Sequence, residues 1–180
     1  MIINNVGLLV AAPIKDMLDY KAKEHGVSSG LSEAGYDIRL AQDIRFYAPK
    51  KSVSRFLGRE SWSQPLIHIR NSESGRMQYI QSRFTLAHAM EEFNMPTNMV
   101  GKVHDKSTWA RQGISVFNTV IEPGWEGFLT LEIVFHGNKD VFIPAGSGIA
   151  QVLFFQLAEH SRYDGKYQHQ ENRPVESKFR

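Results

Sequence analysis

Cysteine is absent from this chain of 180 residues, and several other features that would point to a function are missing too. Without cysteine there can be no disulfides and no thiolate metal sites, so stability must come from packing and assembly. The seven histidines show no spacing typical of a metal site. A disulfide-stapled secreted domain and a cysteine-ligated zinc site are thereby excluded.

A surplus of charge of one sign is also missing. The chain has 21 basic and 19 acidic side chains and a net charge of +2, unlike the basic surplus of a dedicated nucleic-acid binder. No run of about 18 apolar residues could cross a membrane, and the apolar stretch 6–13 is short, with no preceding Lys or Arg. We therefore expect a soluble, unprocessed cytoplasmic protein with no nucleic-acid or membrane partner.

Nucleotide-binding loops of the common kinds are missing as well. The chain has no Walker A sequence. The segment 146–148, Gly-Ser-Gly, lacks the third glycine of a dinucleotide-binding loop, and no βαβ pattern surrounds it. This segment is predicted to be a plain turn.

The residues that are present predict one mostly β domain with a proper core. Hydrophobic residues make up 42% of the chain and aromatic residues 11%, which is enough to build a core at this length. Short alternating segments separated by Gly and Pro are typical of a β sandwich or barrel. The expected strands are 36–40, 84–89, 128–134, 140–143 and 149–157, with turns at 94–96 and 144–148.

Two further segments carry other patterns. Apolar residues at helical spacing follow Pro13 as far as Gly26, which predicts an N-terminal helix there. The segment 50–75 is rich in Ser, Arg and Lys, and it is predicted to form irregular loops around a short strand with the least internal order. The three tryptophans are expected in the core or at an interface rather than as base-stacking platforms: Trp62, Trp109 and Trp125.

Charged residues interrupt the strand pattern between residues 101 and 133. Lys106, Ser107, Thr108 and Arg111 offer two cations and two hydroxyls, which is the donor set that a phosphate or a carbonyl oxygen requires. This stretch is therefore the candidate active site.

A carboxylate ends the same stretch inside an apolar strand. Alternation in 128–134 places Glu132 on one face with Phe128, Thr130 and Val134. Such a carboxylate is solvated at a sheet edge, paired with a cation such as Arg111, or held with a raised pKa for proton transfer. The pattern alone leaves all three open.

Two polar segments outside this stretch are also candidates. Asp37 and Arg39 share one face of a predicted strand, which indicates a site or an interface, although a solvated sheet face is commoner. From His160 the chain turns polar, as a frayed terminus would. The tail also has aromatic, cationic and amide groups suited to a lid over a phosphorylated ligand: Tyr163, Lys166, Tyr167 and Gln170.

These residues lie in motifs that resemble those of the dCTP deaminases of the dUTPase-like superfamily, in the same order and over most of the chain. The motifs are GYDIR at 35–39, KSTWAR at 106–111, EPGWEG and TLE within 122–132, GIAQ at 148–151 and KYQHQ at 166–170. The chain departs from the family pattern at 81–83, where Gln-Ser-Arg replaces Pro-Gly, in the loops 50–75, and in a shorter spacing from 163 to 166.

The resemblance implies a distorted β-barrel or sandwich of the dUTPase-like type with a short N-terminal helix. Residues 1–160 would form one domain and residues 161–180 an arm over the nucleotide. The implied activity is the hydrolysis of dCTP to dUTP and ammonia. Mg²⁺ would be bound through the triphosphate. The resemblance also implies a homotrimer with active sites at the subunit interfaces. Because the zinc-deaminase signature needs cysteine, any deamination must proceed without zinc.

The resemblance also implies roles for individual residues. Glu132 would be the proton shuttle, with Arg111 and Ser107 orienting it, the water or the pyrimidine edge. Glu122 would meet the deoxyribose 3′-hydroxyl. The residues expected to contact the substrate are Lys106, Ser107, Thr108, Arg111, Glu122, Thr130, Leu131, Glu132, Gln151, Tyr163, Lys166 and Gln170.

Alternative activities remain open: a bifunctional enzyme that carries dCTP through to dUMP, a dUTP diphosphatase, and a non-catalytic nucleotide-binding regulator. The interval from Arg111 to Glu122 is shared with dUTPases, so it does not distinguish the two activities. The resemblance implies that simple dUTPases have no counterpart of Glu132, and this residue therefore decides in favour of a deaminase. Glu122 stands where dUTPases have a water-orienting Asp, so its longer side chain predicts poor hydrolysis of dUTP. A non-catalytic regulator is disfavoured because the chain retains all the polar residues that the resemblance assigns to the reaction: Lys106, Ser107, Arg111, Glu122 and Glu132.

Overall fold

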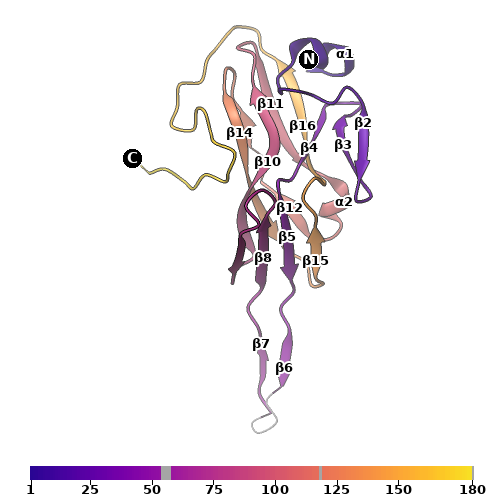
Figure 1. Cartoon of the computed structure of the whole chain (residues 1–180), viewed down its shortest axis with the longest axis vertical. Coiled ribbons are helices and arrows are strands. Elements are labelled where there is room, and N and C mark those ends of the chain that lie inside the picture. Colours follow the sequence, from indigo (N-terminus) through magenta and orange to yellow (C-terminus); the bar gives the residue numbers. More distant parts are fainter. Residues whose placement is uncertain (54–57, 118, 180) are drawn as a thin grey trace.

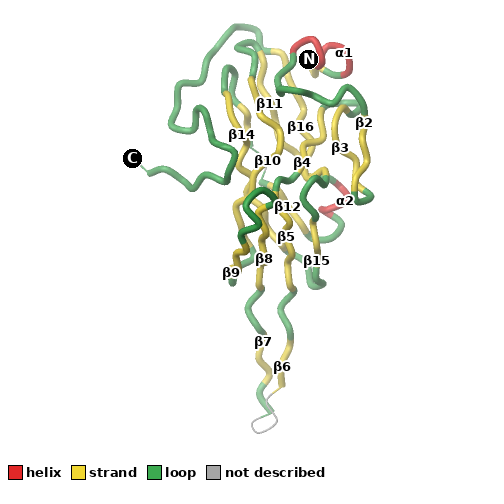
Figure 2. Tube along the Cα trace, viewed as in Figure 1, coloured by secondary structure: helices red, strands yellow, loops and turns green. Residues whose placement is uncertain are grey.

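Strands dominate the computed structural model, which describes residues 1–53, 58–117 and 119–179 (Figure 1, Figure 2). The helices in these residues are short: α1 (Asn5–Ala11) and α2 (Ser107–Ala110). No helix of this part of the chain is long and apolar enough to span a membrane. The prediction of a mostly β fold with a short N-terminal helix is confirmed.

The largest sheet is antiparallel and runs in the order β13-β11-β16-β4-β3-β2, with β1 also paired to β16. Two of the predicted strands, 36–40 and 149–157, are its central members β4 and β16. Its strands are β1 (Ile2–Ile3), β2 (Lys21–Glu24), β3 (Val27–Leu31), β4 (Tyr36–Arg39), β11 (Met99–Asp105), β13 (Val120–Ile121) and β16 (Gly148–Gln156).

A second sheet, in the order β10-β14-β12, carries the predicted strands 84–89 and 128–134. Its strands are β10 (Phe84–Asn94), β12 (Ile114–Val116) and β14 (Glu126–Phe135). Along β14, Leu129, Leu131 and Ile133 are buried in the core, while Glu132 and Val134 on the other face are half-buried. Because of this alternation, the face of β14 that carries Glu132 and Val134 does not pack into the core.

A third sheet, in the order β15-β5-β8-β9, continues into a two-stranded hairpin that extends away from the body (Figure 1). Its strands are β5 (Gln42–Tyr47), β8 (Leu66–Asn71), β9 (Met77–Ile80) and β15 (Val141–Ile143), and the hairpin strands are β6 (Lys51–Val53) and β7 (Glu60–Trp62).

The prediction of irregular loops over 50–75 is therefore wrong, because the segment contains β6, β7 and β8. These strands escaped notice because β6 and β7 are exposed on both faces, so no apolar alternation marks them. Trp62 is 65% exposed, so of the two predicted places, the core or an interface, it is not in the core. The predicted low order of this segment concerns residues 54–57 as well, which lie outside the described residues.

One continuous core joins the three larger sheets. Phe46 of β5 stacks on Phe135 of β14 with ring centroids 5.2 Å apart, and Phe154 of β16 belongs to the same buried cluster. All three side chains are fully buried. Since a buried Phe side chain contributes roughly 2–3 kcal/mol of transfer free energy, this cluster fixes the sheets as a frame for the polar face of β14.

The helix predicted from Pro13 to Gly26 is not there. The helix α1 ends before it, at Ala11, and is capped by Ala12, whose φ is 45°. The residues after Pro13 form turns and then β2, and Gly26, with φ 79°, lies in the tight turn between β2 and β3. Ile14 is buried because it bridges to Phe93 of β10, so its helical spacing reflects tertiary contacts rather than a helix.

Both charged residues of β4 have a partner of opposite charge within the chain. Asp37 is 2% exposed and its Oδ2 lies 2.5 Å from Lys106 Nζ. Arg39 donates through Nε to Glu91 Oε1 at 2.8 Å and through its backbone N–H to Glu91 Oε2 at 2.9 Å. The expectation that these charges meet another subunit is therefore corrected.

A bulge in β10 sets this arrangement. The β10–β14 register shifts between His88 and Glu92, and Glu91 in the shifted stretch turns its carboxylate onto Arg39. Burial is the largest influence on this carboxyl and raises the pKa of Glu91, while the bonds from Arg39 oppose that rise.

We predict that Arg39→Met destabilises the fold by about 3 kcal/mol, because it leaves a buried carboxylate without its cation. The loss should shrink as the pH falls, since a carboxyl whose folded pKa is raised becomes neutral and ceases to oppose folding. Urea unfolding followed by tryptophan fluorescence measures both effects. The control is Lys21→Met, which breaks an exposed pair with Glu33 and should change little. Equal unfolding midpoints for the two variants would contradict this account.

Candidate active site

A cavity of about 480 Å³ lies between the polar face of β14 and the C-terminal arm, residues 161–179. This volume is in the range of small-molecule sites. Its walls come from β10, from the segment 119–125, from β14 and from the arm. The lining residues are Phe84, Leu86, Thr119, Val120, Ile121, Glu122, Trp125, Leu129, Thr130, Glu132, Tyr163, Tyr167, Gln170, Val175 and Ser177.

Glu132 is a carboxylate on a largely apolar wall of this cavity. It pairs across the sheet with Leu86, and its backbone carbonyl accepts a hydrogen bond from the Phe117 N–H at 3.0 Å. Burial raises the pKa of Glu132 above the ordinary glutamate value. A half-buried carboxyl of this kind can exchange protons nearer to neutral pH than an exposed one.

The arm reaches the cavity by pairing with β14 along its edge. The His169 N–H donates to Glu126 O at 2.9 Å, and the Phe128 N–H donates to Gln170 O at 3.0 Å. Gly127, with φ 129°, permits this approach, because a Cβ there would lie 2.5 Å from the Gln170 nitrogen. The arm therefore has a defined place on the sheet.

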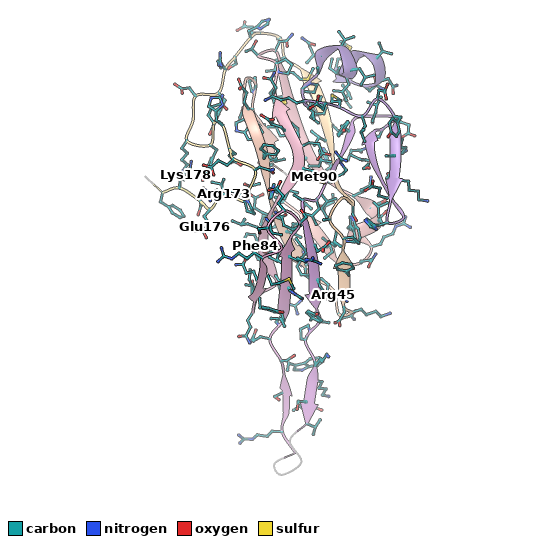
Figure 3. The ribbon with its side chains drawn as sticks, in the orientation of Figure 1. Arg45, Phe84, Met90, Arg173, Glu176 and Lys178 are labelled. Atoms are coloured by element: carbon teal, nitrogen blue, oxygen red, sulfur yellow. The ribbon has the colours of Figure 1, made fainter. Side chains whose placement is uncertain are left out.

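Side chains then hold the arm across the cavity. The Thr130 hydroxyl donates to Gln170 Oε1 at 3.1 Å and accepts the Val175 N–H at 3.1 Å. Trp125 donates its indole N–H to Tyr167 O at 2.7 Å. Figure 3 shows Arg173, Glu176 and Lys178 of the arm on the same side of the molecule as Phe84 of β10.

The hydroxyls and cations of the 106–111 motif lie elsewhere in the same chain. Lys106 is buried against Asp37, which also accepts the Ser28 hydroxyl at 3.0 Å. The second oxygen of Asp37 has no partner among the described residues, so Lys106 is its main counter-charge. Gln151 donates to the Ser32 hydroxyl at 2.9 Å in the same region.

The two hydroxyls and the second cation of the motif are exposed. Ser107, Thr108 and Arg111 lie on or next to α2, away from the lining of the cavity. Within residues 1–53, 58–117 and 119–179, no cationic side chain comes within 4.0 Å of the Glu132 carboxylate. Of the three alternatives for Glu132, the single chain thus favours the raised pKa over an Arg111 ion pair.

The predicted substrate residues therefore fall into two groups within one chain. One group lines the cavity: Glu122, Thr130, Glu132, Tyr163 and Gln170. The other does not: Lys106, Ser107, Thr108, Arg111, Leu131, Gln151 and Lys166. The Leu131 side chain is in the core, and Lys166 lies on the exposed arm with Nζ 5.2 Å from the Tyr167 ring centroid.

Comparison with known proteins agrees with this arrangement of motifs. A family model described as dCTP deaminase-like matches residues 9–157. The chain belongs to the dCTP deaminase family. It is 34% identical to a dCTP deaminase of Chlamydia felis over 159 residues, which cover 86% of this chain and 82% of the relative. It is 36% identical to one of Helicobacter pylori over 149 residues, which cover 80% of this chain and 78% of the relative.

A solved structure of the dUTPase of EIAV overlaps with the dCTP deaminase-family chain at a TM-score of 0.48 and 19% identity. The overlap covers 87% of this chain and 92% of that one. The family assignment rests on the sequence matches and not on this partial overlap.

Several cavity residues of this dCTP deaminase-family chain were not predicted from sequence. Phe84 and Leu86 occupy alternate positions of the predicted strand 84–89, but their place opposite Val134 and Glu132 depends on the register of β10 against β14. Trp125 was expected to be buried, which it is at 5% exposure, yet it also contributes to the cavity wall. To predict these cavity residues, one would have needed the pairing register of the predicted strands 84–89 and 128–134.

We predict that the Glu132 carboxyl of this dCTP deaminase-family chain titrates above the ordinary glutamate range in the ligand-free protein, because burial disfavours its charged form. Carboxyl carbon NMR of glutamate-labelled protein, assigned with Glu132→Gln, measures this directly. Glu33 provides the internal control, since its bonds to Lys21 lower the pKa of that carboxyl. Titration of Glu132 at or below Glu33 would refute the burial account.

Proposed function

We propose that this chain hydrolyses the 4-amino group of dCTP, giving dUTP and ammonia, with Glu132 as the proton carrier. The observation that carries the proposal is a half-buried carboxyl with a raised pKa in a cavity lined by residues of the motifs at 122–132 and 166–170, in a chain of the dCTP deaminase family. Such a reaction belongs to pyrimidine deoxynucleotide metabolism, and we place it in the cytoplasm.

The chemistry needs one group that both takes and gives a proton. Water adds to C4 of the cytosine and forms the new C–O bond, while the electron pair of the C4–N3 double bond moves onto N3 and one proton of the water passes through Glu132 to N3. The bond from C4 to the amino group then breaks as the remaining hydroxyl proton passes through Glu132 to the amine, so that ammonia leaves and the C4 carbonyl of dUTP forms. A carboxyl with a raised pKa suits both steps, because it is basic enough to receive a proton and acidic enough to return it.

The cavity residues offer separate contacts to the rest of the nucleotide. Glu122 is exposed at the cavity and is the proposed partner of the deoxyribose 3′-hydroxyl. Thr130, Tyr163 and Gln170 are the proposed contacts to the base and phosphates from β14 and the arm. Mg²⁺ enters on the triphosphate as part of the substrate. The arm, residues 161–180, acts in this proposal as a lid on the domain 1–160.

We further propose that the complete site is shared between subunits of a homotrimer. Glu132 lies in the cavity, whereas Ser107, Thr108 and Arg111 are exposed and outside it. A triphosphate requires cations that the cavity wall of a single chain lacks among its described lining residues. A second copy that brings its own 106–111 motif to the cavity mouth would supply Arg111 and the two hydroxyls.

We predict that Glu132→Gln lowers ammonia release from dCTP by at least about 100-fold, because general acid and base groups contribute that much and this residue acts in both directions. Nucleotide binding should persist, since the amide keeps the size and hydrogen-bonding reach of the carboxyl. Coupled ammonia detection and calorimetric binding measure the two quantities.

The matched control for this substitution is Glu126→Gln, at the start of the same strand but outside the cavity lining. This variant should retain near-normal ammonia release. If Glu132→Gln releases ammonia at a rate close to that of the control, Glu132 is not the proton carrier.

The shared site predicts complementation between two inactive variants. Arg111→Ala and Glu132→Gln should each be inactive alone, while co-assembled mixtures should recover about a quarter of the wild-type activity for random trimers. The recovery arises because some sites then combine an intact Glu132 with an intact Arg111 from the neighbour. A mixture no more active than its parents would place both residues within one chain's site.

A further inference from the structure

A buried histidine under the C-terminal arm has no part in the proposed chemistry. His88 lies in the middle of β10 and is 2% exposed. It pairs across the sheet with Thr130, the residue whose hydroxyl holds Gln170 and Val175 of the arm. His88 is therefore at the point where the arm crosses the polar face of the sheet.

Both ring nitrogens of His88 have partners, and the partners determine where its proton sits. Gln42 Oε1 accepts the His88 backbone N–H at 3.2 Å, which turns the Gln42 amide NH₂ toward Nδ1 of the ring. Nδ1 must then accept, so the proton of the neutral imidazole is on Nε2. From there it is donated to Asn172 Oδ1 at 2.9 Å, which is a contact to the arm.

Asn172 is held from a second side as well. Its Nδ2 donates to Glu73 Oε1 at 2.9 Å, on the turn between β8 and β9. A single arm residue thus bridges the β10–β14 sheet and the β8–β9 turn. The latch, defined as Gln42, His88, Asn172 and Glu73, spans 130 positions of sequence between Gln42 and Asn172, so no local pattern could reveal it.

We propose that His88 is a positioning residue that latches the arm through Asn172, and that uptake of a second proton by its ring releases the arm. A proton on Nδ1 would place a donor against the Gln42 NH₂ group. The amide cannot rotate to relieve this, because its oxygen is fixed by the His88 backbone N–H. The neutral ring therefore fits the closed arm, and the charged ring does not.

The charged groups around the latch decide the direction of the pH effect. The elements packed against His88 carry Asp43 and Arg45 on β5, Glu73 and Arg76 on the β8–β9 turn, Glu126 and Glu132 on β14, and Glu171 and Arg173 beside Asn172 on the arm. Of these charges, that of Glu73 acts on the His88 ring. Burial lowers the pKa of His88 below the ordinary imidazole range, although the hydrogen bond to Asn172 and, to a smaller extent, the charge of Glu73 both favour the charged ring. Glu171 and Arg173 pair with each other at 2.6 Å.

The sign follows from this lowered pKa. Where the pH is above the ordinary imidazole range, His88 is neutral with the arm open or closed, and closing costs no proton. As the pH falls through that range, the ring of the open form takes up a proton that the closed form must expel. Closure of the arm therefore weakens toward acid pH. This inference rests on the proposed function in one respect only, namely that the cavity covered by the arm is the active site that contains Glu132.

Hydrogen exchange of the ligand-free, full-length protein tests the latch without any assay of activity. The reporters are the amides of His169 and Val175, which are bonded to Glu126 O and Thr130 Oγ1 in the closed arm. Protection factors, which correct for the intrinsic pH dependence of exchange, should fall about three- to tenfold between about pH 8 and about pH 5.5. Unchanged protection over this range would overturn the proton-linked release.

Three variants separate the latch from general effects on folding. Asn172→Ala should lower protection of both reporters at about pH 8 by at least about three- to tenfold, because it removes both the bond from His88 and the bond to Glu73. His88→Gln keeps a donor near Asn172 but cannot titrate, so its protection should not depend on pH. Arg173→Ala, the control on the same arm, pairs with Glu171 and lies outside the latch, so it should match the wild type.

The outcomes also distinguish the latch from the proposed function. Unaltered reporter protection in Asn172→Ala, a substitution on the exposed arm that poses no risk to the core, would overturn the latch itself. A pH-dependent fall that persists in His88→Gln would assign the proton to another group. A protein that fails to release ammonia from dCTP but shows the expected exchange pattern would refute the proposed function and leave the latch intact.

Discussion

Removal of water from the Glu132 carboxyl is the constraint on which the rest of the site depends. The carboxyl is half-buried because β14 sets it opposite Leu86 and the arm closes the other side of the cavity. An isolated buried charge opposes folding, and this one has no nearby cation among the described residues to offset it. The large core shared by three sheets stabilises a fold that carries this cost, and the same desolvation raises the pKa of the carboxyl that we propose as the proton carrier.

The other acidic groups show how different partners give different roles. Asp37 and Glu91 are more deeply buried than Glu132, but each faces a cation, Lys106 and Arg39. Those pairs stabilise the junctions of β4 with α2 and with β10. Glu132 differs because it lines the cavity and has no cation beside it among the described residues. In the proposed trimer its cationic counterpart comes from the substrate complex or from another subunit. The Glu132 carboxyl is therefore distinguished from Asp37 and Glu91 because it is half-buried without a cation beside it.

Sequence patterns predicted the strand positions well, because alternation is local. The face of Glu132 and the strands β4, β10, β14 and β16 followed from the period of two. Contacts between distant segments could not be predicted in this way. Asp37 meets Lys106 across 69 positions, and Ile14 owes its burial to Phe93 rather than to a helix. The family resemblance supplied the candidate site residues, but it could not show that they form two groups within one chain.

The account is tested most directly by incubating the wild-type protein separately with dCTP and with dUTP in the presence of Mg²⁺, and resolving ammonia, dUTP, dUMP and pyrophosphate. The account predicts equal amounts of ammonia and dUTP from dCTP, with little dUMP from either nucleotide, because Glu122 misplaces the water needed for phosphate cleavage. Absence of ammonia would contradict the assignment of Glu132. Conversion of dUTP to dUMP and pyrophosphate at a rate comparable with deamination would instead establish a bifunctional enzyme.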